Sequence, residues 1–398
     1  MKQQRMKRHR RKKKKEKGKE KTIQAAREEE AEIVKMQTLP FEIIREILSR
    51  LPVKSLFRFR CVSKDWSCLI SDPFFISLHL NRSSEKNPSL CLTDGDRCFF
   101  TAPIDGSSTA TMVNIPFEEL MDPAEIVGSC NGLLCLVFSN SWRIFFWNPA
   151  IREFKKLPDA PIVSPRILMI TNTVLGFGYD PINDEYKVVR IIYVCVRSWK
   201  DSLIFQCDDV SVFSLGTGKW KKLGNVPFGI NSMSSQAVVN GSIHWMATQK
   251  INSELSDLIV SFDVRNEVFR EIQLPNCVEG KRHKFVRALE GFLSLIECIP
   301  GGNVEIWVMK DYGVNGSWTK QFTIELLYGY GFEDSRAVFP KEILRSGEIL
   351  IEKNNKNLVL YNPESKGQRE LEINGLPDGF ESFLFMESLV PLSDGSKY

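Results

Sequence analysis

The sequence predicts an α+β protein with two folded parts: a small three-helix module over residues 38–80 and an all-β, propeller-like domain over residues 90–392. Three observations support this prediction. Residues 38–80 show helical periodicity and contain no glycine. From residue 90 onward, alternating apolar runs are broken by Gly, Asn, Asp and Pro, as expected for short strands. Glycine-containing turns recur in that region about every 50 residues, which is typical of propeller blades.

Composition narrows the class of protein. A hydrophobic content of 43% is ordinary for a chain that buries a core. No apolar run reaches the roughly 18 residues of a transmembrane helix, so we expect no membrane partner. The basic N-terminus has no apolar stretch behind it and does not resemble a secretory signal. The ten cysteines form no CxxC pair, and in a chain without such a signal we expect reduced, mostly buried thiols in the cytoplasm or nucleus.

Charge is distributed unevenly along the chain. Residues 1–21 carry a net charge of +11 and the whole chain +4, so the remaining residues carry −7. We therefore expect residues 1–37 to be a disordered charged tail. Its basic run, residues 7–21, is compatible with a nuclear localisation signal, a nucleic-acid-binding arm or a solvated charge run. The mildly acidic remainder argues against nucleic acid as a partner.

The first predicted helix begins near Pro40, because proline is preorganised for the first helical turn. Its apolar residues fall within an arc of about 140° and its polar residues occupy the opposite side, so this helix has one face to bury. The apolar set is Ile43, Ile44, Ile47, Leu48 and Leu51.

The second predicted helix begins at Pro52 and is apolar over most of its circumference, including Val53 and Leu56. Ser63 is the expected N-cap of a third helix that ends at Asp72-Pro73. A module this small cannot bury all of its apolar surface. Periodicity alone leaves two alternatives open: the surplus packs against the β domain, or it is covered by another protein.

Residues 38–80 closely resemble the F-box. The resemblance rests on Leu39-Pro40, the Ile-rich first helix, Leu51-Pro52-Val53 and the segment Cys61–Trp66. It implies docking on a Skp-type adaptor and, through it, on a cullin ubiquitin ligase. When the contact positions of the family are matched to this sequence, the residues expected to bind the adaptor or support that contact are Leu39, Pro40, Ile43, Ile44, Ile47, Leu48, Leu51, Pro52, Val53 and Leu56. Trp66, Ile70 and Phe74 are expected to hold the helices together.

A polar linker is expected at residues 81–89, followed by about six blades. Four alternating runs, 130–138, 239–247, 289–297 and 345–353, each open with a glycine turn. A second run ending in an aromatic residue and a polar turn follows each of them. Residues 88–127 and 376–392 are expected to supply the first and closing strands.

The β domain resembles the plant-type F-box-associated, kelch-like domain. The resemblance is carried by residues 128–136, 145–158, 176–191 and 239–247, and it implies that this domain recognises an unknown client protein. The client-binding residues cannot be assigned. Exposed turn candidates, each also explicable as a turn former or rim charge, are Asn148, Arg152, Tyr179, Asp184, Arg197, Trp199, Lys200 and Tyr330. The strand pattern places Trp147, Phe213, Trp220, Trp245, Phe262 and Trp307 in the core.

Catalytic motifs are missing from the sequence. It contains four histidines and no HExxH, G-x-S-x-G or P-loop motif. The pair Gly176 and Gly178 lacks the third glycine of a dinucleotide site, and Cys130 and Cys135 have no histidine partner for zinc. We therefore predict no catalytic residue, no metal and no cofactor.

The resulting function prediction is a non-catalytic, substrate-recognising subunit of an SCF-type (Skp–cullin–F-box) ubiquitin ligase. Two alternatives belong to other classes. One is a nuclear β-propeller that binds proteins without any ligase role. The other is a propeller glycosidase with two catalytic carboxylates, which a single sequence does not exclude.

Overall fold

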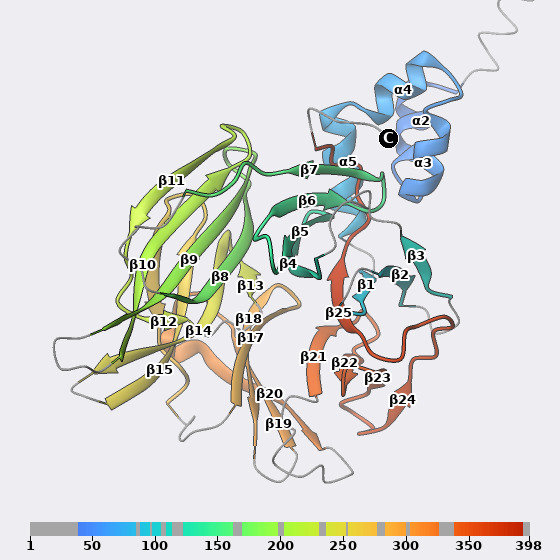
Figure 1. Ribbon diagram of the computed structural model, residues 1–398. Coiled ribbons are helices and arrows are strands. Elements are labelled where there is room, and N and C mark those ends of the chain that lie inside the picture. The colour runs from blue at the N-terminus through green and yellow to red at the C-terminus, as the bar shows by residue number, and fades with distance from the viewer. Residues whose placement is uncertain are drawn as a thin grey trace, which may run out of the picture. The chain divides into compact units, whose positions relative to one another are not determined.

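A computed structural model describes residues 39–84, 88–95, 98–104, 109–113, 122–161, 169–197, 203–230, 236–251, 254–276, 283–299, 303–325 and 338–392. The chain divides into two compact units, Met1–Phe75 and Ile76–Tyr398. The expected basic tail, residues 1–37, lies outside the described residues. Helices occupy the start of the described chain and strands the rest (Figure 1).

Four helices form the N-terminal region of the described chain: α2 (Phe41–Leu48), α3 (Val53–Phe59), α4 (Lys64–Ile70) and α5 (Pro73–Ser83). Pro40 and Pro52 occupy the N-cap positions of α2 and α3. The three predicted helices are therefore confirmed, with the prolines where the sequence analysis expected the helices to begin.

The fourth helix was not predicted. Ser63 Oγ accepts a hydrogen bond from the Trp66 backbone N–H (3.2 Å), which confirms it as the N-cap of α4. Asp72 Oδ1 accepts one from the Phe75 N–H (3.1 Å), and Pro73 opens α5. The Asp-Pro pair thus ends one helix and begins the next, which the sequence analysis missed. Because α5 runs to Ser83, part of the predicted linker is helical.

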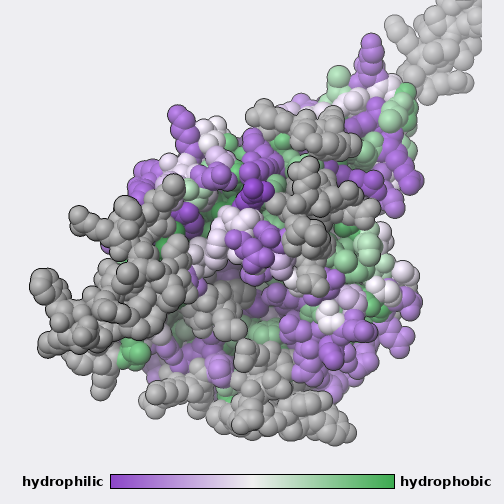
Figure 2. All heavy atoms as spheres, in the orientation of Figure 1, coloured by the Kyte–Doolittle hydropathy of each residue, from purple (hydrophilic) through white to green (hydrophobic). Residues whose placement is uncertain are grey.

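The helical region buries Leu48, Val53, Leu56, Leu69 and Ile70. Trp66 packs edge-on against Phe59, with ring centroids 5.5 Å apart. Phe74, which was expected to help hold the helices together, is 65% exposed, whereas its neighbour Phe75 is fully buried. Consecutive residues of a helix point about 100° apart, so only one of the two rings can face inward. Hydrophobic residues also lie on the outer surface of this region (green, upper right in Figure 2).

The β unit consists of six antiparallel sheets, numbered here as blades one to six. Blade one contains β25 (Glu381–Phe385), β1 (Ser89–Thr93), β2 (Phe99–Pro103) and β3 (Thr111–Val113). Blade two contains β4 (Ala124–Cys130), β5 (Leu133–Phe138), β6 (Ile144–Asn148) and β7 (Glu153–Lys156). Blade three contains β8 (Met169–Asp180), β9 (Glu185–Arg197), β10 (Leu203–Ser214) and β11 (Lys219–Gly224).

Blade four contains β12 (Gly229–Ile230), β13 (Ala237–Val239), β14 (Ser242–Ile251), β15 (Glu254–Asp263) and β16 (Val268–Ile272). Blade five contains β17 (His283–Leu289), β18 (Phe292–Cys298), β19 (Asn303–Met309) and β20 (Trp318–Glu325), with a short 3-10 helix, Asn315–Ser317, before β20. Blade six contains β21 (Val338–Ile343), β22 (Ile349–Lys353), β23 (Asn357–Tyr361) and β24 (Gln368–Glu370).

The six blades form a closed ring. Six hydrophobic clusters each join two neighbouring blades, and together they link every blade to the next, including six to one. Blade one is completed by the C-terminal strand, because β25 pairs antiparallel with β1 from Ser89–Phe385 to Thr93–Glu381 (Figure 1). The predicted six-bladed propeller, with its first strand near residue 88 and its closing strand beyond residue 376, is confirmed.

The recurring glycines mark the first hairpin of a blade. At Asn131-Gly132, Asn240-Gly241 and Glu290-Gly291 both residues have positive φ, from 49° to 81°. Two consecutive left-handed residues define the type I′ turn, whose twist matches the flanking strands and which favours Asn-Gly. The repeat seen in the sequence is therefore a repeat of hairpin turns. Of the six predicted core aromatics, all but Trp220 are buried, and Trp220 is half-buried against the same core.

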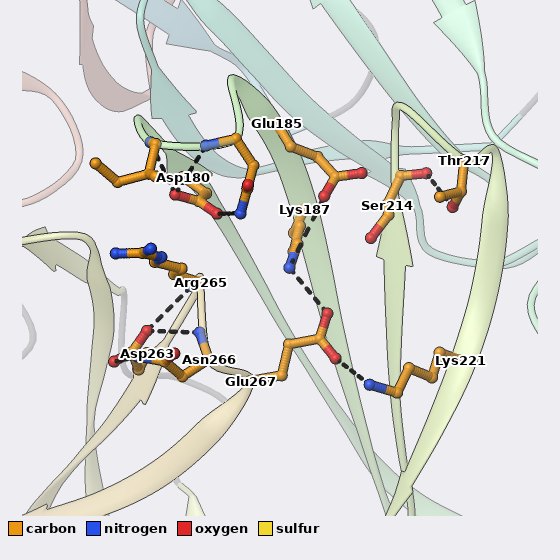
Figure 3. Close-up of polar contacts among 12 residues, drawn as sticks. Asp180, Glu185, Lys187, Ser214, Thr217, Lys221, Asp263, Arg265, Asn266 and Glu267 are labelled. Atoms are coloured by element: carbon orange, nitrogen blue, oxygen red, sulfur yellow. Dashed lines mark hydrogen bonds and ion pairs between the residues drawn. The ribbon is translucent and has the colours of Figure 1, made fainter.

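Carboxylates organise the outer turns and link blades three and four (Figure 3). Asp180 Oδ1 accepts from the Ile182 N–H (3.0 Å), and Asp263 Oδ1 accepts from the Asn266 N–H (2.9 Å). Glu267 of the second turn receives Lys187 Nζ on one oxygen (2.8 Å) and Lys221 Nζ on the other (2.6 Å). Because Lys187 is buried, removing Glu267 would leave its charge poorly compensated, which makes loss of this one partner costly.

The Gly-x-Gly segment of β8 has a packing role. A Cβ at Gly176 would overlap the Trp245 ring of blade four, and a Cβ at Gly178 would lie 2.7 Å from Val264 Cγ2. The two glycines therefore let the next blade approach closely.

One glutamine side chain connects three blades. Gln236, just before β13, accepts from the Phe177 N–H (2.7 Å) and donates to the Phe177 carbonyl (2.9 Å), as a neighbouring strand would. Its amide lies directly over Gly128 of β4, where a Cβ would overlap it. A glycine in β4 is therefore required for the Gln236 amide to reach β8.

We expect Gly128→Ala and Gln236→Ala each to lower the free energy of unfolding of the propeller, the latter by about 2 kcal/mol for two lost hydrogen bonds. The double variant should lose clearly less stability than the sum of the losses in the two single variants, because removing the Gln236 amide makes room for the methyl group. Urea unfolding of the four proteins measures the coupling. Strictly additive costs would show that the two residues act independently.

Candidate functional site

Exposed apolar side chains are concentrated in the helical region. Of the fourteen large hydrophobic residues exposed in the described chain, seven lie in the short segment from Leu39 to Phe74. These seven are Leu39, Phe41, Ile43, Ile47, Phe57, Val62 and Phe74. Such a concentration on a small surface is typical of a protein-interaction site.

Helix α2 divides its apolar arc between the interior and the surface. Ile43 and Ile47 are one turn apart and 45% and 47% exposed, and Leu39, one turn earlier, is 57% exposed. On the other edge, Ile44 is half-buried and Leu48 is buried. We call Leu39, Ile43 and Ile47 the apolar stripe. The helical region covers one edge of the arc and leaves the stripe exposed.

A cation with two aromatic rings extends this exposed surface. The Arg45 guanidinium carbon lies 5.5 Å from the centroid of Phe41 and 5.8 Å from that of Phe74. Both distances are within the range of cation–π attraction, so one arginine holds two exposed rings near each other. The sequence analysis did not name Phe41 and gave Phe74 only a role in internal packing. The sequence did contain a clue to the exposure of Phe74. Asp72-Pro73 starts α5, and the start of the helix sets which way the side chains of Phe74 and Phe75 point.

The ten residues assigned by resemblance fall into three groups. Exposed are Leu39, Pro40, Ile43, Ile47 and Pro52; half-buried are Ile44 and Leu51; buried are Leu48, Val53 and Leu56. The buried three can support a contact surface but cannot form much of it themselves. Adaptor contact by the other seven stays a prediction.

The propeller turns give little support to the proposed client-binding candidates. Asn148 is fully buried, and its Nδ2 donates to the carbonyls of Ser388 (3.1 Å) and Val390 (2.9 Å), so its placement on the surface is wrong. Tyr179 is half-buried and donates to Asp184 Oδ1 (2.6 Å). Arg152 and Asp184 are exposed turn residues with positive φ. Arg197 lies at the end of β9, but its side chain, like Trp199, Lys200 and Tyr330, is outside the described part of the chain.

A cavity of about 640 Å³ lies where the innermost strands of the propeller converge. Strands β4, β17, β21 and β25 line it together with the start of β13, which represents five of the six blades. Its walls carry charged side chains, among them Arg287, Lys341 and Glu381. No feature of the sequence pattern pointed to this cavity, because its walls come from strands far apart in the chain.

The described histidines do not form a catalytic site. His244 is fully buried; its Nδ1 donates to the Ala237 carbonyl (3.1 Å) and its Nε2 accepts from the Tyr312 hydroxyl (2.8 Å). His79 is buried and His283 lies exposed on a strand. Within the described ranges, no three His, Cys, Asp or Glu residues are grouped to hold a metal ion. None of the helices described is long and apolar enough to span a membrane.

Comparison with known families identifies both parts of the chain. Residues 36–78 match the F-box domain, and residues 87–393 match the F-box associated beta propeller domain. The chain is an F-box protein with an F-box-associated propeller. Both resemblances stated from the sequence are thereby confirmed.

The relatives are plant F-box proteins. F-box protein CPR1 of Arabidopsis thaliana is 31% identical over 374 residues, covering 89% of each chain. F-box/kelch-repeat protein At3g23880 of the same plant is 30% identical over 309 residues, covering 74% of this chain and 81% of the relative. F-box family proteins are typically non-catalytic adaptors. The nuclear role of the basic run stays a prediction, because residues 7–21 are not described.

Acidification should destabilise this F-box protein through His244. Burial lowers the pKa of His244 to about 4, against smaller opposite effects of its hydrogen bonds. Between the ordinary value of 6.5 and about 4, the unfolded chain takes up a proton that the folded chain does not. The free energy of unfolding should therefore decrease as the pH is lowered across this window, and His244 should account for up to about 3 kcal/mol of the decrease.

The measurement is urea unfolding at pH 7.5 and pH 5.0 for the wild type, His244→Gln and His283→Gln. His244→Gln should be less stable than the wild type at pH 7.5 and should lose less stability on acidification. The exposed His283 is the matched control and should follow the wild type. An unchanged pH dependence in His244→Gln would show that other groups cause the acid sensitivity.

Proposed function

We propose that this F-box protein is the substrate-recognising subunit of an SCF-type ubiquitin ligase. The observation that carries the proposal is the exposed apolar stripe Leu39, Ile43 and Ile47 on a helix that buries its other edge. An amphipathic helical face left uncovered in this way is a common mode of protein recognition. The F-box family match supports a Skp-type adaptor as the partner of that face.

In this proposal the chain promotes ubiquitination by positioning. The F-box binds the adaptor and, through it, the cullin ligase, while the propeller holds a client protein. Tethering raises the effective concentration of the client's lysines at the ligase, so the transfer needs no reacting group from this chain. The rival function, a propeller that binds proteins without a ligase, requires the stripe to be irrelevant to any adaptor.

The double variant Ile43→Asp/Ile47→Asp should bind the Skp-type adaptor at least ~100-fold more weakly than the wild type, because two central apolar contacts are replaced by charges that must be desolvated. Both side chains are already exposed, so the variant should remain folded. Binding is measured by isothermal titration with purified adaptor, and folding by thermal unfolding.

The matched control is Ile182→Asp/Leu255→Asp, which places the same charges at two exposed apolar positions of the propeller. It should bind the adaptor like the wild type. A well-folded wild-type chain that does not bind the adaptor would refute the ligase assignment and favour the rival function. Equal loss of binding in both double variants would indicate a non-specific effect of charge.

A further inference from the structure

A cluster of charged side chains from three blades lies at the central cavity of the propeller, and Arg287, Lys341 and Glu381 line the cavity itself. Arg287 comes from β17 of blade five, Lys341 from β21 and Glu352 from β22 of blade six, and Glu381 from β25 of blade one. Two cations and two carboxylates therefore meet where the strands converge. Such groups are expensive to bury, so each should have a structural partner or a ligand.

Lys341 and Glu352 have structural partners. Lys341 Nζ lies 3.1 Å from Glu352 Oε2 and donates to the Ser382 carbonyl (2.8 Å). The same Glu352 oxygen accepts from the Ser382 N–H (2.7 Å) and from the Ser382 hydroxyl. These contacts fasten blade six to the closing strand through Lys341 and one Glu352 oxygen; within the described chain the other oxygen, Oε1, is buried without a hydrogen-bond partner.

Arg287 and Glu381 are not accounted for in this way. Among the residues that the structure describes, the guanidinium donates one hydrogen bond, from Nη1 to the adjacent Val286 carbonyl (3.3 Å), and it lies 5.4 Å from the centroid of the Phe285 ring. Among the described residues, no hydrogen bond or ion pair reaches the Glu381 carboxylate, which is exposed to the cavity it lines. The two groups influence each other's pKa without being bonded to each other. One cation with free donors and one free carboxylate therefore face the same space.

Electrostatics limits what can fill that space. Burial lowers the pKa of Arg287 to about 10, and Glu381 and Glu352 offset only part of that effect. Burial also raises the pKa of Glu381. An anion at Arg287 and a hydrogen-bond donor at Glu381 would each stabilise the charged form. A doubly charged phosphate would be repelled by Glu381, whereas a single carboxylate with a nearby N–H group would satisfy both residues.

That combination of groups occurs at the last residue of a polypeptide, where the α-carboxylate and the backbone N–H flank one carbon. A free amino acid or acylated amino acid has the same groups. The cavity volume of about 640 Å³ is in the range of about 300–1,000 Å³ typical of drug-sized ligands, larger than a single amino acid needs. The size therefore favours the end of a chain over a free amino acid.

We propose that the axial cavity of the propeller binds the C-terminal residues of a polypeptide, with Arg287 receiving the α-carboxylate and Glu381 accepting a hydrogen bond from a backbone N–H. Capture of a terminal carboxylate is an established mode of peptide recognition in other proteins. This inference builds on the proposed function, because it identifies the part of a client that the propeller would recognise.

The probe is a library of random eight-residue peptides attached through their N-termini, with free C-terminal carboxylates, and the same library with C-terminal amides. The full-length protein should select peptides from the first library and none from the second. Affinities of the selected peptides are then measured by fluorescence anisotropy. Arg287→Gln should weaken binding at least ~10-fold, as expected for loss of a charge-assisted hydrogen bond, and Glu381→Gln should weaken it less. Arg265→Gln, an exposed arginine of a blade-four turn, is the matched control and should bind like the wild type.

Thermal unfolding shows whether each variant is folded, and Glu381→Gln provides the test if Arg287→Gln is not. Equal selection from both libraries, no selection from either, or unchanged affinity in both cavity variants would overturn the proposal. If N-acetylated single amino acids compete as well as peptides, the assignment to a chain end is wrong. Measuring adaptor binding of the same proteins separates the two hypotheses. Absence of peptide binding with normal adaptor binding would refute only the cavity proposal. Peptide binding without adaptor binding would refute only the ligase role.

Discussion

The pairing of β25 with β1 is the constraint on which the rest of the propeller depends. Each blade buries its faces against its neighbours, so an open ring would leave two blades half exposed to water. The C-terminal strand closes the ring next to the first strand of the domain. Two polar contacts reinforce this closure: Lys341 and Glu352 fasten blade six to Ser382, and Asn148 of blade two holds the carbonyls that follow β25. The long-range contacts of the fold are therefore completed by its last residues.

The sequence predicted the parts of this architecture that have a local cause. Helix starts follow from proline and serine at defined positions, and hairpin turns follow from Asn-Gly pairs that adopt positive φ. Four glycine turns, together with the expected first and closing strands, led to the prediction of about six blades. Family resemblance identified the F-box, and local periodicity predicted the apolar face of α2. The division of that face into a buried edge and the exposed stripe could not be predicted, because it depends on how the other helices pack against it.

The features that the sequence did not reveal arise from contacts between distant segments. Asn148 looks like a surface turn residue in the sequence, but its partners lie some 240 residues further along the chain. Gly176 resembles part of a nucleotide-binding motif until Trp245 of the next blade is seen to pack on it. Phe74 and Phe75 are chemically identical, and only the phase of α5 decides which one is buried. In each case the residue type was clear and the neighbour was not.

The F-box and the propeller differ in the kind of side chain that their own packing leaves without a partner. The F-box is too small to cover its own apolar residues, so its surplus is hydrophobic and lies on the surface. The propeller buries most of its apolar side chains between blades, and incompletely paired charged groups lie on its axis, in the cavity where the innermost strands converge. A hydrophobic surface suits a lasting partner that shields it from water. A charged cavity suits a ligand whose charges are complementary, since a mismatched one leaves Arg287 or Glu381 desolvated and unpaired. The stripe is thus suited to a constant partner and the cavity to selection among many.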